Sequence, residues 1–173
     1  MTATELFETY DHDGRPLGLV PRGEVHRRGL WHRASNVLLF DRTGRLYLQR
    51  RAAGKDIWPN AWDVSVGEHL QPGETFEQAA HRGLDEELSI RGVVLTALGG
   101  VVRGCVDMPE FGIKDHELQQ SFRGVYEGEY SIDPVEVADV RRITLHDLAV
   151  EIAATPTAFT PWLRSRLREF GLI

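Results

Sequence analysis

The stretch from Gly67 to Ile90 reads GEHLQPGETFEQAAHRGLDEELSI and predicts a tight loop that leads into a helix. Pro72 and Gly73 interrupt regular structure and mark the loop. Thr75 is followed three residues later by Gln78, the spacing of a capping box at the start of a helix. Residues 67–90 are therefore expected to form one loop-and-helix unit around which the rest of the chain is organised.

The expected helix carries an apolar stripe with charged side chains beside it. The stripe contains residues spaced four positions apart, which stack on one face of a helix: Phe76, Ala80, Leu84 and Leu88. Glu86 and Glu87 lie off this stripe, and Arg82 precedes Glu86 by about one turn. Carboxylates bind divalent cations and arginine binds phosphate. The unit therefore predicts a place that holds a cation and a phosphate.

Length and composition favour a single globular domain that spans residues 1–173. No apolar run approaches the roughly 20 residues of a membrane span, and the N-terminus lacks the pattern of a signal peptide. A net charge of −6 argues against binding to a nucleic-acid polymer. The lone cysteine, Cys105, fits a reducing compartment. We expect a cytoplasmic protein, a monomer or homodimer, with no membrane association.

Outside the central unit, strand patterns alternate with turns and helical segments. Strands are expected at residues 6–10, 16–20, 34–40, 45–50, 62–66, 93–102, 117–126 and 137–143. Two further helices are expected at 145–153, with Thr144 as N-cap, and at 162–170. Loops are expected at 22–29, 51–60, 104–115 and 155–161, and 45–50 is expected to be the hairpin partner of 34–40. This order predicts an α+β sandwich.

The central unit resembles the Nudix box, G-x5-E-x7-R-E-U-x-E-E-x-G-U, in which U is aliphatic. The coinciding residues are Glu74, Arg82, Leu84, Glu86, Glu87 and Ile90. The resemblance implies an α/β/α sandwich around a mixed β-sheet. It also implies that Glu86 and Glu87 bind Mg²⁺ or Mn²⁺.

Three box positions differ from the Nudix pattern. Glu68 stands for the first glycine, Gly83 for the glutamate after arginine, and Ser89 for the last glycine. The change at Gly83 matters most, because that glutamate is often the catalytic base or a metal ligand in the family. Glycine in a helix interior costs about 1 kcal/mol relative to alanine, so Gly83 indicates either a packing requirement or a lost function.

Nearly the whole chain resembles isopentenyl-diphosphate isomerases and the Nudix hydrolases nearest to them. The resemblance runs from Gly14 to Trp162 and is carried by QRRAAGKDIWPNAWDVSVGEH at 49–69 and ATPTAFTPW at 154–162. It implies that the substrate diphosphate is bound by Arg22, Arg51, Lys55 and Arg82. It places the ring of Trp162 over the substrate carbon chain, where a π face stabilises developing positive charge.

The same resemblance implies a metal site built from histidines and carboxylates. The matching residues are His26, His32, His69, Asp115 and Glu117. Such a set suits Mn²⁺, Mg²⁺ or Zn²⁺. Because Glu86 and Glu87 form a second cluster, a further Mg²⁺ is expected to bridge Glu87 and the diphosphate.

One departure bears on the reaction. The isomerases use a cysteine just before the G-H loop, and that position is Gly67 here, whereas Glu117 of the E-x-E segment is kept. We therefore predict a divalent-metal-dependent Nudix hydrolase of a diphosphate-containing small molecule, either a nucleoside diphosphate derivative or a prenyl diphosphate. Its catalytic residues are expected among Glu117, Glu86 and Glu87.

The sequence leaves open the identity of the base, the function and the role of Cys105. The base is Glu117, Glu86 or Glu74, and the sequence does not choose among them. The first alternative function is an isomerase-like enzyme with altered acid and base residues, and the second is a non-catalytic diphosphate-binding protein. Cys105 aligns with a tyrosine that approaches the isomerase site. The hypothesis that its thiol enters the pocket competes with its being a small buried hydrophobic residue.

Overall fold

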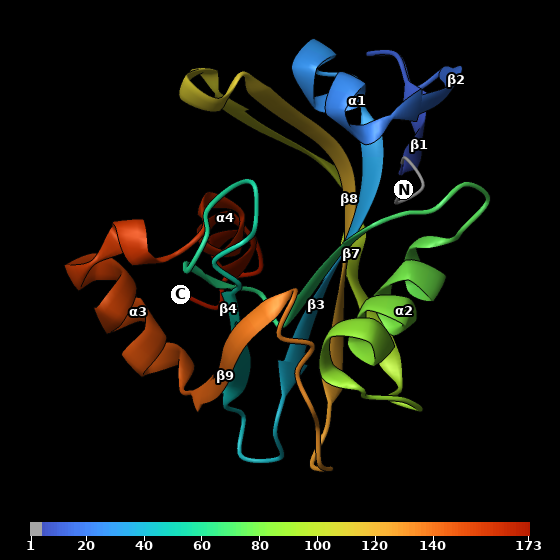
Figure 1. Ribbon diagram of the computed structural model, residues 1–173. Helices are drawn as coiled ribbons and strands as arrows, with labels where there is room; N and C mark the ends of the chain where they lie inside the picture. Colours follow the sequence, from blue (N-terminus) through green and yellow to red (C-terminus); the bar gives the residue numbers. More distant parts are fainter. Residues whose placement is uncertain (1–4) are drawn as a thin grey trace.

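The computed structural model describes residues 5–173, which form a two-stranded hairpin and a seven-stranded mixed sheet with helices on both faces (Figure 1). The strands are β1 (Leu6–Tyr10), β2 (Pro16–Pro21), β3 (His32–Phe40), β4 (Leu46–Arg51), β5 (Trp62–Asp63), β6 (Val66–His69), β7 (Leu95–Met108), β8 (Ile113–Val125) and β9 (Val137–Ile143). The helices are α1 (Arg22–Arg28), α2 (Phe76–Leu88), α3 (Leu145–Ala154) and α4 (Pro161–Glu169), with short 3-10 turns η1 (Pro109–Phe111) and η2 (Pro156–Ala158).

Strand β3 is the centre of the large sheet. It pairs in parallel with β8 along its whole length and antiparallel with β6 over residues 34–37. Helix α2 covers one face of the sheet, whereas α3 and α4 cover the other (Figure 1). Each face has its own buried apolar cluster, one centred on Leu84 of α2 and one on Leu148 of α3. The expected α+β sandwich around a mixed sheet is confirmed.

Helix α2 forms as its sequence predicts. The side chain of Thr75 accepts a hydrogen bond from the backbone of Gln78, and the side chain of Gln78 accepts one from the backbone of Thr75, so the capping box is complete. Of the predicted stripe, Ala80, Leu84 and Leu88 are fully buried. This packing fixes the helix, and with it the side chains of residues 82–87, against β3 and β6.

The two central strands β3 and β4 separate soon after their connecting turn. They pair only at Phe40 and Leu46, and β4 then pairs along its length with β9, so the expected hairpin is wrong beyond its first pair. Ser65 spans the gap, because its hydroxyl accepts from the Leu39 N–H at 2.9 Å and donates to the Tyr47 carbonyl at 2.6 Å. The expected strand 62–66 is accordingly split between β5 and β6.

Two segments that were expected to be loops form regular secondary structure. Residues 22–28 form α1, because Val25 and His26 are buried against the rest of the fold and Gly29 ends the helix in a left-handed conformation, with φ 65°. Residues 104–115 mostly belong to the long β7–β8 hairpin, whose tip is η1. Exposure alternates along 101–108, the period of a strand, and Pro109 and Gly112 mark only the tip. Within residues 5–173, no helix is both long and apolar enough to cross a membrane.

Helix α2 ends on a strained residue, from which a stability prediction follows. Ser89 has φ 55°, the left-handed region that costs an L-residue roughly 1–2 kcal/mol and that the Nudix box fills with glycine. Its hydroxyl gains an exposed hydrogen bond to Ser131 at 2.8 Å, which offsets little of that cost. We expect Ser89→Gly to raise the free energy of unfolding by about 1 kcal/mol in urea titrations. An unchanged or lower value would contradict the assignment of strain.

Candidate active site

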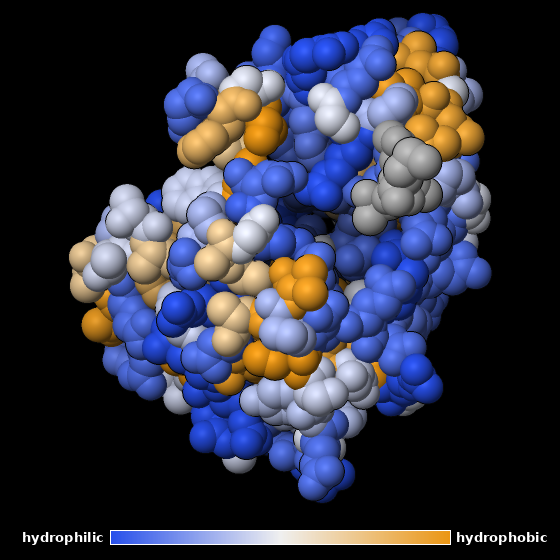
Figure 2. All heavy atoms as spheres, in the orientation of Figure 1, coloured by the Kyte–Doolittle hydropathy of each residue, from blue (hydrophilic) through white to orange (hydrophobic). Residues whose placement is uncertain are grey.

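A cavity of about 550 Å³ opens among β6, α2, β8 and the loop after β4. Its lining is mainly charged and polar, and Figure 2 shows hydrophilic residues around the hollow. The predicted site residues that line it are Arg22, Arg51, Lys55, His69, Arg82, Glu86, Glu87, Asp115, Glu117 and Trp162. The remaining two, His26 and His32, lie beside His69 and Asp115. The fold thus brings together residues from six separate stretches of the chain.

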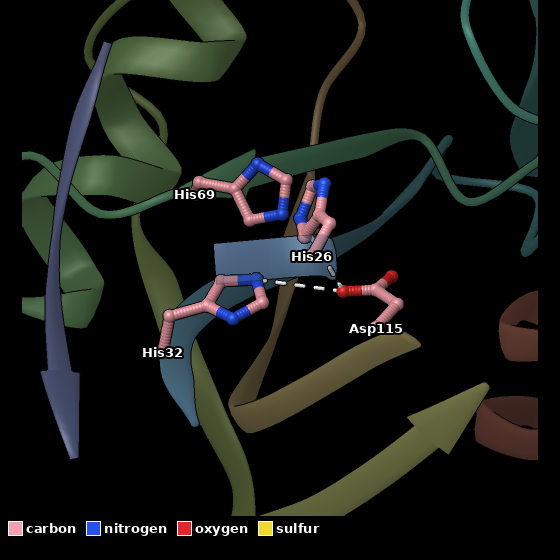
Figure 3. A group of neighbouring side chains, drawn as sticks. All are labelled: His26, His32, His69 and Asp115. Carbon is pink, nitrogen blue, oxygen red and sulfur yellow. Dashed lines mark ion pairs between the residues drawn. The ribbon is translucent and has the colours of Figure 1, made fainter. Parts of the chain in front are cut away.

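Three imidazoles and a carboxylate converge at one side of the cavity (Figure 3). Potential ligand atoms of His26, His32, His69 and Asp115 all lie within 4.8 Å of one another. Nε2 of His32 is 3.4 Å from Oδ1 of Asp115, and Nε2 of His26 is 3.7 Å from the same oxygen. These three atoms are buried and have no hydrogen-bond partner in the described part of the chain. Orphaned polar atoms that face one another fit a bound cation.

The three imidazoles of the cluster differ in protonation. Burial opposes a charge on His32, but Asp115 and Glu117 raise its pKa above the usual value, so a cation bound there would displace a proton. Burial lowers the pKa of His69 to about 3 and that of His26 to about 4, so both imidazoles are neutral near pH 7. Nδ1 of His32 lies 3.0 Å from the Leu30 carbonyl, and donation there leaves the Nε2 lone pair directed at the cluster. Glu117 adds a second carboxylate, with Oε1 3.1 Å from Nε2 of His69. Neutral imidazole and ionised carboxylate are the forms that bind divalent metals.

Phe7 on β1 supports the imidazoles from behind, a role that the sequence did not reveal. Its ring is 2% exposed and stacks on His32, with centroids 5.1 Å apart and planes at 13°. It also lies 4.7 Å from the His69 ring and meets the His26 ring edge-on at 6.1 Å. Since one rigid aromatic side chain contacts all three histidines, it restricts their rotamers and fixes the geometry of the cluster.

A second acidic region lies on α2. Glu87 is only 5% exposed, and its carboxylate accepts a hydrogen bond from the Gln49 amide, the only one it makes within residues 5–173. Burial, followed by the charge of Glu68, raises the pKa of Glu87 to about 8. A buried carboxylate without a cationic partner is costly, and a divalent cation removes that cost. Glu86 is more exposed and pairs with Arg82 at 3.1 Å.

Arg82 braces the loop 67–74 against α2. Its Nε and Nη2 donate to Glu74 at 2.9 and 3.0 Å, and Nη2 also donates to the His69 carbonyl at 2.8 Å. Nη1 donates to Glu68 at 2.5 Å and to Glu86 at 3.1 Å. Because a guanidinium has five N–H donors, none is left over. The expectation that Arg82 clamps the diphosphate therefore gains no support from the geometry.

The other expected diphosphate ligands are better placed. Arg51 donates to Asp63 at 3.2 Å and lies over the Trp162 ring, with 5.4 Å from Cζ to the centroid. The indole N–H of Trp162 donates to the same carboxylate at 2.6 Å, so Asp63, which the sequence analysis missed, fixes both side chains. Lys55 pairs with Glu136 at the edge of the cavity. Arg22 pairs with Glu5 at 3.3 Å and also lines the cavity.

Cys105 lies outside the cavity. It is exposed on β7, opposite His116 of β8, and is absent from the residues that line the cavity. The hypothesis that its thiol enters the site is wrong, and so is the alternative of a small buried residue. The reason is the extended hairpin, in which residue 105 belongs to a strand whose exposed positions alternate with partly buried ones.

Comparison with known proteins identifies the class. The family model of the NUDIX domain matches residues 30–163, and the chain belongs to the Nudix family. It is 40% identical over 157 residues to isopentenyl-diphosphate Delta-isomerase of Nocardia farcinica, with 90% of this chain and 89% of the relative covered. It is 43% identical over 95 residues to an uncharacterized Nudix hydrolase of Pseudomonas aeruginosa, with 55% and 56% covered.

Solved structures agree on the fold. The crystal structure of DR0079 from Deinococcus radiodurans matches 96% of this chain and 99% of its own, with a TM-score of 0.77 and 23% sequence identity. A structure of a MutT NUDIX hydrolase from Burkholderia pseudomallei matches 80% of this chain and 96% of its own, with a TM-score of 0.59 and 19% identity. The expected Nudix sandwich is thereby confirmed.

Proposed function

We propose that this Nudix protein is a divalent-metal-dependent hydrolase that cleaves a diphosphate bond in a small molecule. One observation carries the proposal: the buried carboxylate of Glu87, which has no cationic partner within residues 5–173, lines the same cavity as Arg51 and Lys55. A metal–diphosphate complex supplies a cation to the Glu87 carboxylate, and its phosphate oxygens accept from Arg51 and Lys55, which Asp63 and Glu136 hold at the cavity. The cavity volume suits a small-molecule ligand.

The division of labour follows from the positions of the side chains. When bound, a divalent cation would polarise the phosphoryl oxygens and make a water molecule more acidic. Glu86 and Glu87 hold that cation from α2, while Arg51 and Lys55 hold the diphosphate and Trp162 covers the remainder of the substrate. Among the candidate bases, Glu74 is the poorest, because hydrogen bonds from Arg82 and from the Gln71 N–H occupy its carboxylate. Glu86 and Glu117 remain.

An isomerase of isoprenoid diphosphates is the second candidate. Relatives bear that name, and the histidine cluster and Trp162 are the residues that the resemblance assigns to it. Against it stands Gly67, which offers no proton donor. A Cβ added there would lie 3.6 Å from both Asn36 Oδ1 and Val64 Cγ2, an ordinary contact, so a side chain is absent although space for its first atom exists. Hydrolysis does not need a side chain at this position.

Asn36 gives the cavity a polar wall beside Gly67. Its side chain is 5% exposed, and Nδ2 has no hydrogen-bond partner in the described part of the chain. Asn36 also lines the cavity and pairs with Gly67 across β3 and β6. An unsatisfied amide donor in this place favours a substrate with a hydrogen-bond acceptor over a plain alkene. Nucleoside diphosphate derivatives and prenyl diphosphates both carry phosphate oxygens that can accept from this amide.

The proposal is tested with the purified chain, Mg²⁺ or Mn²⁺, and a panel of nucleoside diphosphate derivatives and prenyl diphosphates. Phosphate is measured both directly and after phosphatase treatment, which also reveals phosphomonoester products. We expect metal-dependent cleavage of at least one member of the panel. Ligand-induced thermal stabilisation without cleavage of any panel member would instead favour a diphosphate-binding protein. Gly67→Cys is the matched variant, since a gain of alkene isomerisation there would show that only the thiol is missing.

A further inference from the structure

Two positions of the Nudix box have exchanged residue types, and they face each other in the structure. Glu68 on β6 stands where the box has glycine, and Gly83 on α2 stands where it has glutamate. A Cβ at position 83 would lie 2.5 Å from Cγ of Glu68 and 2.5 Å from Cγ1 of Val66. Carbon atoms do not approach so closely without displacement. Gly83 is therefore a packing requirement, and the side chain of Glu68 occupies the space beside it.

The carboxylate of Glu68 reaches the acidic side of the cavity. It lines the cavity together with Glu86 and Glu87, and its side chain is 21% exposed. Oε2 accepts from Arg82 at 2.5 Å, and the same Nη1 atom of Arg82 donates to Glu86. Oε1 makes no hydrogen bond within residues 5–173, so one oxygen remains for a ligand. Strand β6 thus contributes a third carboxylate to the cavity, in addition to the two from α2.

Two further observations support a ligand in this region. The carboxyl groups of Glu68, Glu74 and Glu86 share one cation, Arg82, and Glu87 pairs with none in the described part of the chain, so four carboxyl groups have a single guanidinium between them. Independently, Asn36 is 95% buried and lines the same cavity, and its Nδ2 has no hydrogen-bond partner in the described part of the chain. A divalent cation with its coordinated water or phosphate oxygens matches both, since the cation meets the carboxylates and the oxygens meet the amide.

We propose that Glu68 supplies, from β6, the carboxylate that α2 lacks at position 83, and that it holds the divalent cation together with Glu86 and Glu87. The inference deepens the proposed function, because it concerns the same cation. The exchange conserves the number of carboxylates at the site and moves one of them from the helix to the facing strand. It also explains why the helix has a glycine at an interior position, where glycine is less favourable than alanine.

A double-mutant cycle at positions 68 and 83 tests the proposed exchange. Four proteins are compared: the parent, Glu68→Gly, Gly83→Glu, and the double variant that restores the box pattern. All carry His69→Ala, so that the histidine cluster does not contribute Mn²⁺ binding. Mn²⁺ affinity is measured by electron paramagnetic resonance, and the melting temperature is measured without metal.

We expect Glu68→Gly to weaken Mn²⁺ binding at least about tenfold, on the scale of changes around metal sites. Gly83→Glu alone is expected to lower the melting temperature, because its Cβ collides with Glu68 and Val66. The double variant is expected to melt above Gly83→Glu, because the contact with Glu68 is removed while that with Val66 stays, and to bind Mn²⁺ with an affinity within about threefold of the parent. Non-additive recovery of this kind distinguishes a carboxylate exchange from a loss of packing.

Glu68→Gln tests whether the charge of Glu68 binds the metal without disturbing the fold. It preserves the shape of the side chain and an acceptor for Arg82, so only the charge is lost, and weaker Mn²⁺ binding at an unchanged melting temperature is expected. Parent-like Mn²⁺ affinity in Glu68→Gln, or a stable double variant without recovered affinity, would overturn the inference. Because metal binding is measured directly, the cycle decides the role of Glu68 even if no diphosphate in the substrate panel is cleaved.

Discussion

Glu87→Gln is expected to lower kcat for diphosphate hydrolysis by about 10²–10³-fold, the scale observed when one charge-stabilising group is removed from an active site. The substitution retains the shape of the side chain and an acceptor for the Gln49 amide, but it removes the negative charge that faces the cation. Because burial raises the pKa of Glu87 to about 8, its carboxyl is mostly protonated in the metal-free protein near pH 7, and the neutral glutamine is expected to keep the protein folded with an equal or higher melting temperature. Mg²⁺ should then raise the melting temperature less than it does in the parent.

A matched control for this variant lies on the same helix. Glu77 is in the first turn of α2, with a side chain 63% exposed, and it is not among the residues lining the cavity. Glu77→Gln is expected to leave kcat and the Mg²⁺-induced thermal shift unchanged. If Glu87→Gln retained more than about a third of the parent kcat at saturating Mg²⁺, the carboxylate on α2 would not serve the reaction.

His69→Ala is expected to weaken binding of Mn²⁺ or Zn²⁺ at the histidine cluster by at least about 100-fold, the upper end of changes measured around metal sites. The neutral imidazole of His69 supplies one of the nitrogen donors, and its removal leaves His26, His32 and Asp115 as an incomplete set. Metal content after purification and calorimetric titration of the metal-free protein measure the loss. The carbonyl of residue 69 still accepts from Arg82, so the loop should keep its structure.

His116→Ala is the control for the cluster. His116 follows Asp115 on β8, but its Nε2 pairs with Asp107 at 2.9 Å, outside the cluster. We expect this variant to bind the metal as tightly as the parent does. Equal loss in both variants, or no loss in His69→Ala, would be inconsistent with a metal centre formed by the three imidazoles.

Local sequence signals predicted those parts of the fold that local contacts determine. The start of α2 follows from Thr75 and Gln78, and its buried face follows from residues spaced four apart. In contrast, α1 is a short helix that forms because Val25 and His26 are buried by distant strands, which no local pattern reveals. The separation of β3 from β4 depends likewise on Ser65 and on pairing with β9, more than 80 residues along the chain.

For the candidate site too, the sequence predicted only what local motifs mark. Resemblance to known families located the histidines and the basic loop, because their positions are marked by motifs. It did not show that the five donors of Arg82 are already engaged, since its partners are defined only by the folded loop. Asp63 was missed because its partner Trp162 is 99 residues away. The meaning of Gly83 required the distance to Glu68, although both departures from the box were visible in the sequence.

The two candidate reactions differ at a small part of the cavity. Binding of a cation and a diphosphate draws on Glu87, Arg51 and Lys55, which either reaction would use. The choice between them rests on the wall formed by Gly67 and Asn36, where an amide donor is present and a thiol is absent. Cleavage of the diphosphate is consistent with this wall, whereas proton transfer to an alkene lacks its donor.

The most direct test follows both reactions in one sample. The protein is incubated in D₂O with Mg²⁺ and Mn²⁺ and either isopentenyl diphosphate or a nucleoside diphosphate derivative, and ³¹P and ¹H spectra are recorded over time. Hydrolysis predicts that diphosphate resonances of the nucleoside derivative give way to those of phosphate monoesters, with no deuterium in the alkene of isopentenyl diphosphate. Deuterium entering that alkene while the diphosphate stays intact would contradict hydrolysis and establish the isomerase instead.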